Sequence, residues 1–146
     1  MPGLEDLYRE IILDHYRTPR NRGELPPPAA HAVGHNPLCG DEIDVYLQVE
    51  GDTVTDVKVG GQGCSISQSS ASMMSQAVKG KSIGEVRALV HRFKTMMSIE
   101  TADDEMPDVK LGDLEALQGV VKFPVRIKCA VLSWNTLVEA LHQATT

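Results

Sequence analysis

The stretch from Glu42 to Gly60 restricts the fold more than any other part of the chain. It reads EIDVYLQVEGDTVTDVKVG, in which apolar residues alternate with polar ones on both sides of residues 50–52, Glu-Gly-Asp. Alternation with a period of two is typical of strands that bury one face, and two such runs joined by a short turn containing glycine predict an antiparallel hairpin. The chain should therefore contain a sheet with one face that other elements must cover.

Helical spacing of apolar residues replaces the alternation on both sides of this hairpin. We predict helices over residues 4–17, 65–78, 83–98, 114–121 and 124–143. Lys79-Gly80 ends the second helix, Ser82 caps the third, and Pro124 takes a first-turn position in the last. Residues 24–37 form an extended, proline-rich connector, and residues 99–112 form an acidic loop.

This order of elements predicts an α+β fold. We expect a small antiparallel sheet of about three strands, the hairpin plus a short neighbour, packed on one face against the helices. A chain of 146 residues is long enough for one core and too short for two ordinary domains, so we expect a single domain over 1–146. Only 4% of the residues are aromatic, so Leu, Val, Ile and Met must fill the interior, with Trp134 as an anchor.

The charge balance excludes several classes of partner. The formal net charge is −6, whereas nucleic acid or an anionic membrane surface requires a basic face. The chain shows neither a signal peptide nor a long apolar run, so we expect a cytoplasmic protein. A reducing compartment disfavours disulfides, which makes metal binding or thiol chemistry the leading use of the three cysteines.

Each cysteine lies at the end of a predicted element, where residues distant in sequence can converge. Cys39 lies in the turn before the first hairpin strand, Cys64 follows GGQG at the start of a helix, and Cys129 lies in the first turns of the last helix. Asp41, two residues after Cys39, completes a set of three thiolates and one carboxylate. Such a set suits tetrahedral zinc, and thiolates are also the usual ligands of iron-sulfur clusters.

Basic residues beside Cys129 add to this pattern. Arg126 and Lys128 are placed to offset the negative charge of the ligands and to attract an anionic persulfide. Each residue also has an ordinary explanation: a lone cysteine is often a small buried hydrophobe, and a carboxylate such as Asp41 is common in turns. His35 is a candidate substitute ligand, although a histidine in a loop is usually solvated.

Three segments resemble one known family. NPLCGDEI, GQGCSISQSS and RIKCAVLSW match, in order, the three-cysteine pattern of the IscU-like scaffolds, the NifU N-terminal family of iron-sulfur cluster assembly. The resemblance covers nearly the whole chain, including LYREIILDHYRTPRNRG. It implies a SufE/IscU-like fold and a role in cluster assembly.

Within that family the chain is more similar to the SufU branch. Lys128 stands where the IscU branch has histidine, VVKFPVRIKC replaces the Leu-Pro-Pro-Val-Lys chaperone motif, and an insertion within residues 96–121 lengthens the spacing between Cys64 and Cys129. The missing motif argues against dependence on a dedicated Hsp70-type chaperone. The SufU branch implies a zinc-bound protein that takes persulfide sulfur from a SufS-type cysteine desulfurase and passes it to downstream assembly proteins.

The resemblance also assigns roles residue by residue. It implies that Cys39, Asp41, Cys64 and Cys129 bind Zn²⁺, that the three cysteines are the ligands of any transient [2Fe-2S] cluster, and that Cys39 accepts the sulfur. Arg126 is expected to steer the persulfide.

Three functional hypotheses follow. The first is a zinc-dependent sulfurtransferase working with a cysteine desulfurase, which the SufU-like features favour. The second is a scaffold that assembles a [2Fe-2S] cluster and transfers it to apo-proteins. The third is a zinc-stabilised structural domain without chemistry of its own.

Overall fold

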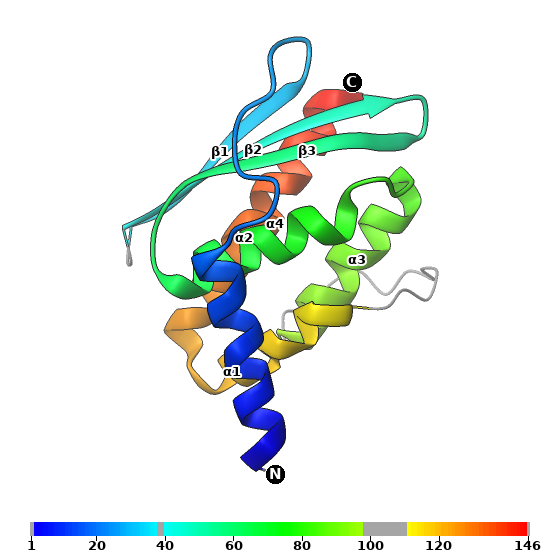
Figure 1. The fold of residues 1–146 in the computed structure, drawn as a ribbon. Coiled ribbons are helices and arrows are strands. Elements are labelled where there is room, and N and C mark those ends of the chain that lie inside the picture. Colours follow the sequence, from blue (N-terminus) through cyan, green and yellow to red (C-terminus); the bar gives the residue numbers. More distant parts are fainter. Residues whose placement is uncertain (1, 38–39, 98–110, 146) are drawn as a thin grey trace.

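The computed structural model describes residues 2–37, 40–97 and 111–145. Its elements, in chain order, are α1 (Pro2–Arg17), β1 (Ala30–Asn36), β2 (Asp41–Glu50), β3 (Thr53–Gln62), α2 (Ser65–Val78), α3 (Ile83–Met96), the 3₁₀ helix η1 (Gly112–Lys122) and α4 (Pro124–Thr145) (Figure 1). The predicted acidic loop falls almost entirely outside the described residues.

The sheet is an antiparallel meander in the order β1-β2-β3 (Figure 1). The hairpin predicted from residues 42–60 is confirmed as β2 and β3, with Glu50 paired to Thr53 across the turn. The alternating apolar residues of β2, Ile43, Val45 and Leu47, are fully buried on the inner face. The sequence pattern therefore predicted both the pairing and the buried face of this hairpin.

The third strand is β1, formed by the second half of the predicted connector. Residues 30–36 pair with residues 41–47 of β2 along their whole length. The predicted extended connector thus contains the third strand, and the predicted three-stranded α+β fold is confirmed. Gly34 interrupts the apolar pattern of β1 because α4 packs closely there, with Leu132 and Thr136 beside its Cα.

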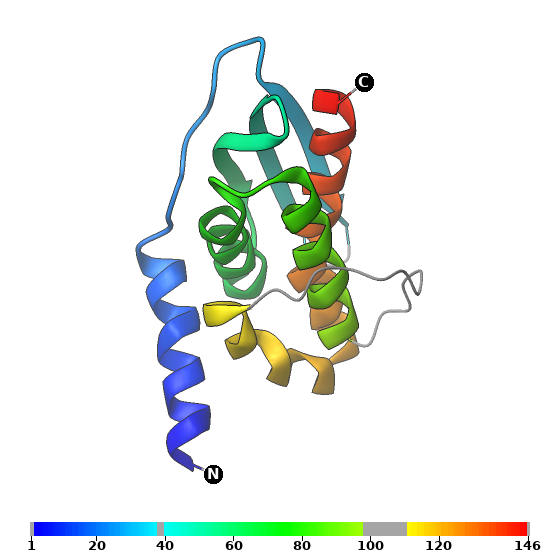
Figure 2. The ribbon, with the colours of Figure 1, turned by 90° about the vertical axis from the view of Figure 1, so that its right-hand side faces the viewer.

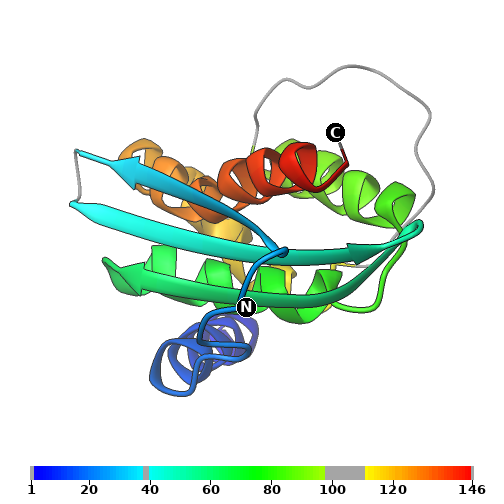
Figure 3. The ribbon, with the colours of Figure 1, turned by 90° about the horizontal axis from the view of Figure 1, so that it is seen from above.

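Helices cover one face of the sheet (Figures 1 and 3). α4 packs against β1 and β2, and α2, which lies beside α4, packs against β3. Trp134 of α4 is fully buried and stacks on Phe93 of α3 with ring centroids 4.6 Å apart. Leu, Val, Ile and Met residues fill most of the remaining core, including Met73 and Met74 of α2.

The helix α1 lies on the outer side of α2 (Figure 2) and also contacts η1. His15 of α1 is fully buried at this junction. Its Nδ1 lies 2.8 Å from Ser72 Oγ in α2, and its Nε2 lies 3.1 Å from Asp113 Oδ2 in η1. The imidazole therefore links three helices through polar contacts.

The helix ends follow the sequence signals. Ser82 and Glu85 form a capping box at the start of α3, and Gly80, with a φ of +82°, lies in the turn that follows α2. The short helix predicted at 114–121 is present within η1, but it is a 3₁₀ helix. None of the helices described is both long enough and apolar enough to cross a bilayer.

The close approach of β1 to α4 gives the first testable prediction. A Cβ added at Gly34 would lie 2.1 Å from Thr136 Oγ1 and 3.1 Å from Leu132 Cδ1. Because two packed elements would have to separate, Gly34→Ala should lower the free energy of unfolding by about 1–3 kcal/mol. Urea titration of the protein in the presence of a chelator measures this.

Gly84→Ala in α3 is the matched control, since the nearest heavy atom to its added Cβ is 3.9 Å away. This variant should raise the free energy of unfolding by at most about 1 kcal/mol. Equal stability of the two variants would contradict the proposed packing constraint at Gly34.

Candidate metal centre

The ends of three elements meet at one edge of the sheet. Asp41 is the first residue of β2, Cys64 is the N-cap residue of α2, and Cys129 lies in the second turn of α4. One ligand atom from each residue lies within 4.8 Å of the others. The convergence predicted from the positions of these residues at element ends is therefore confirmed.

Asp41 is anchored to the start of α2 by its carboxylate. The backbone N–H of Cys64 donates a 2.8 Å hydrogen bond to Asp41 Oδ1, and Asp41 Oδ2 lies 3.9 Å from Cys64 Sγ. The N–H groups in the first turn of a helix have no partner within the helix, so an anionic oxygen is well placed there. Asp41 is 2% exposed, and a carboxylate oxygen lies within 4.8 Å of the sulfurs of Cys64 and Cys129.

Glycines before Cys64 allow this close approach. A Cβ at Gly63 would lie 2.3 Å from Asp41 Oδ1 and 2.6 Å from Ser67 Oγ. Gly61 has a φ of +104°, and a Cβ there would lie 2.0 Å from the carbonyl oxygen of Glu42. The sequence GGQGC thus brings the backbone against β2 and its carboxylate, at positions where a side chain would not fit.

Cys129 forms the deepest part of the site. It is 0% exposed, and its Sγ lies 3.8 Å from Asn36 Nδ2 and 3.9 Å from the carbonyl oxygen of Val125. Asn36 is also the strand partner of Asp41, so β1 and β2 both end at the site. In the sequence Asn36 fell within the predicted connector, so its place beside Cys129 was not predicted.

The donor set fits zinc. Two sulfurs and one carboxylate oxygen are suitable ligands, and a tetrahedral zinc with bonds of about 2.0–2.3 Å places its ligand atoms about 3.3–3.8 Å apart. Small side-chain adjustments would bring atoms now within 4.8 Å to that spacing. Cys39, the predicted fourth ligand, lies outside the described residues. His35, the other candidate, is exposed and does not belong to the cluster found in the described part of the chain.

Arg126 and Lys128 are exposed on α4. Arg126 lies one turn before Cys129 and lines a groove of about 710 Å³ between α1, η1 and the start of α2. Ser65, which directly follows Cys64, lines the same groove. The predicted auxiliary role of Arg126 is thus compatible with its position, while its action on a persulfide stays a prediction.

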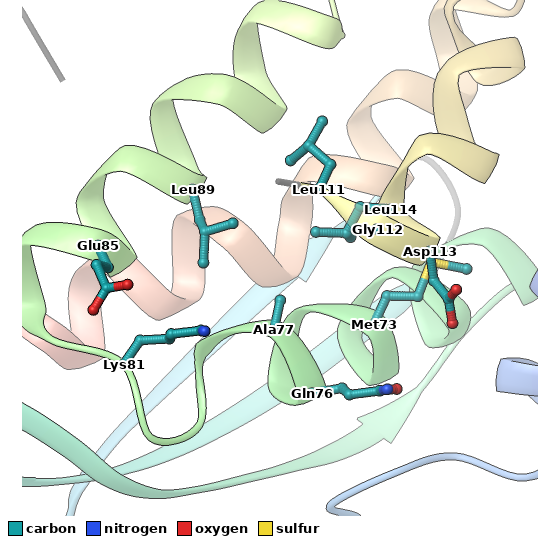
Figure 4. Close-up of a pocket in the computed structure, with 10 residues that line it drawn as sticks. All are labelled: Met73, Gln76, Ala77, Lys81, Glu85, Leu89, Leu111, Gly112, Asp113 and Leu114. Carbon is teal, nitrogen blue, oxygen red and sulfur yellow. The ribbon is translucent and has the colours of Figure 1, made fainter. Parts of the chain in front are cut away.

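A second cavity, of about 550 Å³, lies between α2, α3 and η1 (Figure 4). Its lining includes Lys81, Glu85 and Asp113 around the apolar side chains of Leu89 and Leu111. No cysteine or histidine is among its lining residues in the described part of the chain. The candidate metal centre is therefore separate from this cavity.

Comparisons with known proteins show which family the chain resembles over most of its length. Residues 7–130 match the family described as the NifU-like N-terminal domain. The chain is 50% identical over 139 residues to the zinc-dependent sulfurtransferase SufU of Bacillus subtilis, covering 95% of this chain and 92% of the relative. It is 39% identical over 141 residues to the iron-sulfur cluster assembly scaffold protein IscU of Streptococcus pyogenes, covering 97% and 86%.

A solved structure shares the fold as well. The crystal structure of a putative iron-sulfur cluster assembly scaffold protein for the SUF system from Fervidobacterium islandicum has a TM-score of 0.80 and 32% identity. The match covers 90% of this chain and 94% of that chain.

The packing of Gly63 against Asp41 predicts a specific effect on metal binding. Gly63→Ala should weaken zinc binding about tenfold or more, because the added methyl group displaces the carboxylate. Competition with a chromophoric chelator measures the dissociation constant. Gly60→Ala is the matched control, since its added Cβ would make only ordinary contacts, the nearest at 3.8 Å. An unchanged affinity in Gly63→Ala would argue against Asp41 as a ligand.

Proposed function

Because this chain belongs to the family of NifU-like N-terminal domains, whose members in the comparison include proteins of iron-sulfur cluster assembly, we propose that it is a zinc-dependent sulfur acceptor in that process. The observation that carries the proposal is the convergence of Asp41, Cys64 and Cys129 at one edge of the sheet. The 50% identity to a protein named as a zinc-dependent sulfurtransferase supports it further.

The proposed zinc ligands are Cys39, Asp41, Cys64 and Cys129. When bound, Zn²⁺ would keep the cysteines as thiolates while protecting them from oxidation. The protein contributes the arrangement: the N–H of Cys64 orients the Asp41 carboxylate, and the amide of Asn36 lies beside Cys129 Sγ. These contacts hold Asp41, Cys64 and Cys129, three of the four proposed ligands, in place.

The burial of the other two cysteines supports Cys39 as the sulfur acceptor. Cys129 is fully buried, and Cys64 is half-buried at a helix start, so both are poorly placed to meet a protein partner. Pro37 and Gly40, the described residues on either side of Cys39, are exposed. An acceptor has to reach a sulfur atom on another protein, so Cys39, between these exposed residues in the sequence, is the best candidate.

The transfer itself is a thiol–disulfide type of exchange. The Cys39 thiolate attacks the outer sulfur of a persulfide on the donor protein, the donor's S–S bond breaks, and the donor cysteine leaves as a thiolate. Cys39 then carries the sulfur as a persulfide, and no net oxidant or reductant is consumed. Arg126, which is exposed on α4, would attract the anionic persulfide through its guanidinium.

The chemistry defines the partners. The donor would be a SufS-type cysteine desulfurase, which carries a persulfide on its own cysteine, and the acceptors would be downstream iron-sulfur assembly proteins or apo-proteins. We place the reaction in the cytoplasm, where thiols stay reduced.

A second candidate is a scaffold that builds a [2Fe-2S] cluster on Cys39, Cys64 and Cys129. The observation that favours it is the 38–39% identity over most of the chain to proteins named as IscU scaffolds. The same thiolates suit both functions, so only a functional measurement can separate them.

Cys39→Ala provides the test. The zinc-loaded wild-type protein should stimulate alanine production by the desulfurase when reductant is limiting, because it removes the persulfide that blocks the next turnover. Cys39→Ala should abolish the stimulation while its circular dichroism stays native, since the change is one small side chain between the exposed residues Pro37 and Gly40. Stimulation by Cys39→Ala equal to that of the wild type would exclude Cys39 as the acceptor. A wild-type protein that leaves the rate unchanged but assembles a transferable iron-sulfide cluster would support the scaffold function instead.

A further inference from the structure

The turn that carries Cys64 is held from outside by the segment TPRNRG, residues 18–23. The backbone N–H of Val59 donates to the carbonyl oxygen of Asn21 at 2.9 Å, and the N–H of Gly23 donates to the carbonyl oxygen of Val59 at 3.1 Å. The segment therefore runs beside β3, just before the strand leads into the glycines and Cys64.

The side chain of Arg22 bridges both sides of this turn. Its Nη2 donates to the carbonyl oxygen of Gly61, and its Nη1 donates to Gln68 Oε1 at 2.8 Å. Gly61 precedes Cys64 by three residues and Gln68 follows it by four. The backbone N–H of Gln68 in turn donates to the carbonyl oxygen of Cys64 at 3.1 Å, in the first turn of α2. One guanidinium thus ties the end of β3 to the start of α2 across the cysteine.

The chemistry of the guanidinium suits this bridge. Its donors are held in a rigid planar fork, so two acceptors can be fixed at a set distance. It has no acceptor, so the amide of Gln68 must present its oxygen to Arg22. The Nε2 of Gln68 is then turned inward, where it has no hydrogen-bond partner among the described residues. Arg22 therefore also determines how the Gln68 amide is oriented.

We propose that Arg22 is a positioning residue for the metal centre, which fixes the turn from Gly61 to Gln68 so that the thiol and N–H of Cys64 stay aligned with Asp41. This inference rests on the metal-binding part of the proposed function. The turn contains Gly61 and Gly63, which restrict the backbone little in the absence of other contacts. Without the bridge, metal binding has to order the turn, and that ordering cost appears as a lower affinity.

Arg20 offers a matched control from the same segment. In the described part of the chain its guanidinium bonds to the carbonyl oxygen of Thr18 and to the carboxylate of Asp14, and it makes no contact with the turn around Cys64. Its backbone N–H donates to Ser72 Oγ, a contact that Arg20→Ala leaves in place. Both variants remove one arginine and one positive charge, from a half-buried position at Arg20 and an exposed one at Arg22.

The experiment compares wild type, Arg22→Ala, Arg22→Lys and Arg20→Ala in the full chain. Zinc affinity is measured by competition with a chromophoric chelator. The Co²⁺-substituted proteins are compared by their thiolate-to-metal absorption bands, and the metal-free proteins are compared by thermal unfolding.

Arg22→Ala should bind zinc about tenfold more weakly and show altered Co²⁺ bands, as expected when a contact that orients a ligand is lost. Arg20→Ala should stay within about twofold of wild type, because its lost contacts are remote from the ligands.

Arg22→Lys should fall between these values, since lysine keeps the positive charge but its single ammonium on a flexible chain lacks the rigid fork that fixes two acceptors at a set distance. The metal-free forms of Arg22→Ala and Arg20→Ala should unfold at similar temperatures, because each variant loses only exposed hydrogen bonds.

The outcomes separate this inference from the proposed function. Equal zinc affinity and equal Co²⁺ spectra for Arg22→Ala and Arg20→Ala would overturn the role of Arg22, as would a loss of metal-free stability in Arg22→Ala with unchanged affinity. A wild-type chain that fails to bind zinc would overturn both claims. Zinc binding that depends on Arg22 in a protein that accepts no sulfur would uphold the inference and refute only the sulfurtransferase function.

Discussion

The hydrogen bond from the backbone N–H of Cys64 to the carboxylate of Asp41 connects the two halves of the site. It joins the start of β2 to the start of α2, over a distance of 2.8 Å. The residues around it are adapted to this contact: Gly63 leaves room for the carboxylate, and β1 supplies Asn36 to the opposite side, beside Cys129. The fold therefore brings a helix start, a strand start and a buried thiol together as a group of ligand atoms suited to zinc.

The local pattern of the sequence predicted most of the fold. Alternation defined the β2–β3 hairpin, the Ser82–Glu85 capping box defined the start of α3, and Pro124 marked the start of α4. The third strand was predicted as a short neighbour of the hairpin but was not located, because the pattern of residues 30–36 is interrupted by Gly34 and preceded by a run of prolines. What makes residues 30–36 a strand is pairing with β2 and close packing under α4, and neither is a property of the segment itself.

The site was predictable to a similar extent. The positions of Asp41, Cys64 and Cys129 at element ends predicted that they would converge, and they do. The contributions of Asn36 and Arg22 could not be predicted, because both act through contacts with residues distant in sequence. The role of the glycines before Cys64 is also visible only in the structure, where they allow the chain to approach β2 and Asp41. The ligand role of Cys39 and the persulfide-steering role of Arg126 stay predictions.

X-ray absorption at the zinc edge tests the central claim most directly, because it reports the ligand atoms themselves. The zinc-loaded protein should show three sulfur neighbours at about 2.3 Å and one oxygen neighbour at about 2.0–2.2 Å. The sulfur count should fall to two in Cys39→Ala. A zinc environment with two or fewer sulfur neighbours in the wild-type protein, or one unchanged by the loss of Cys39, would contradict the proposed set of ligands.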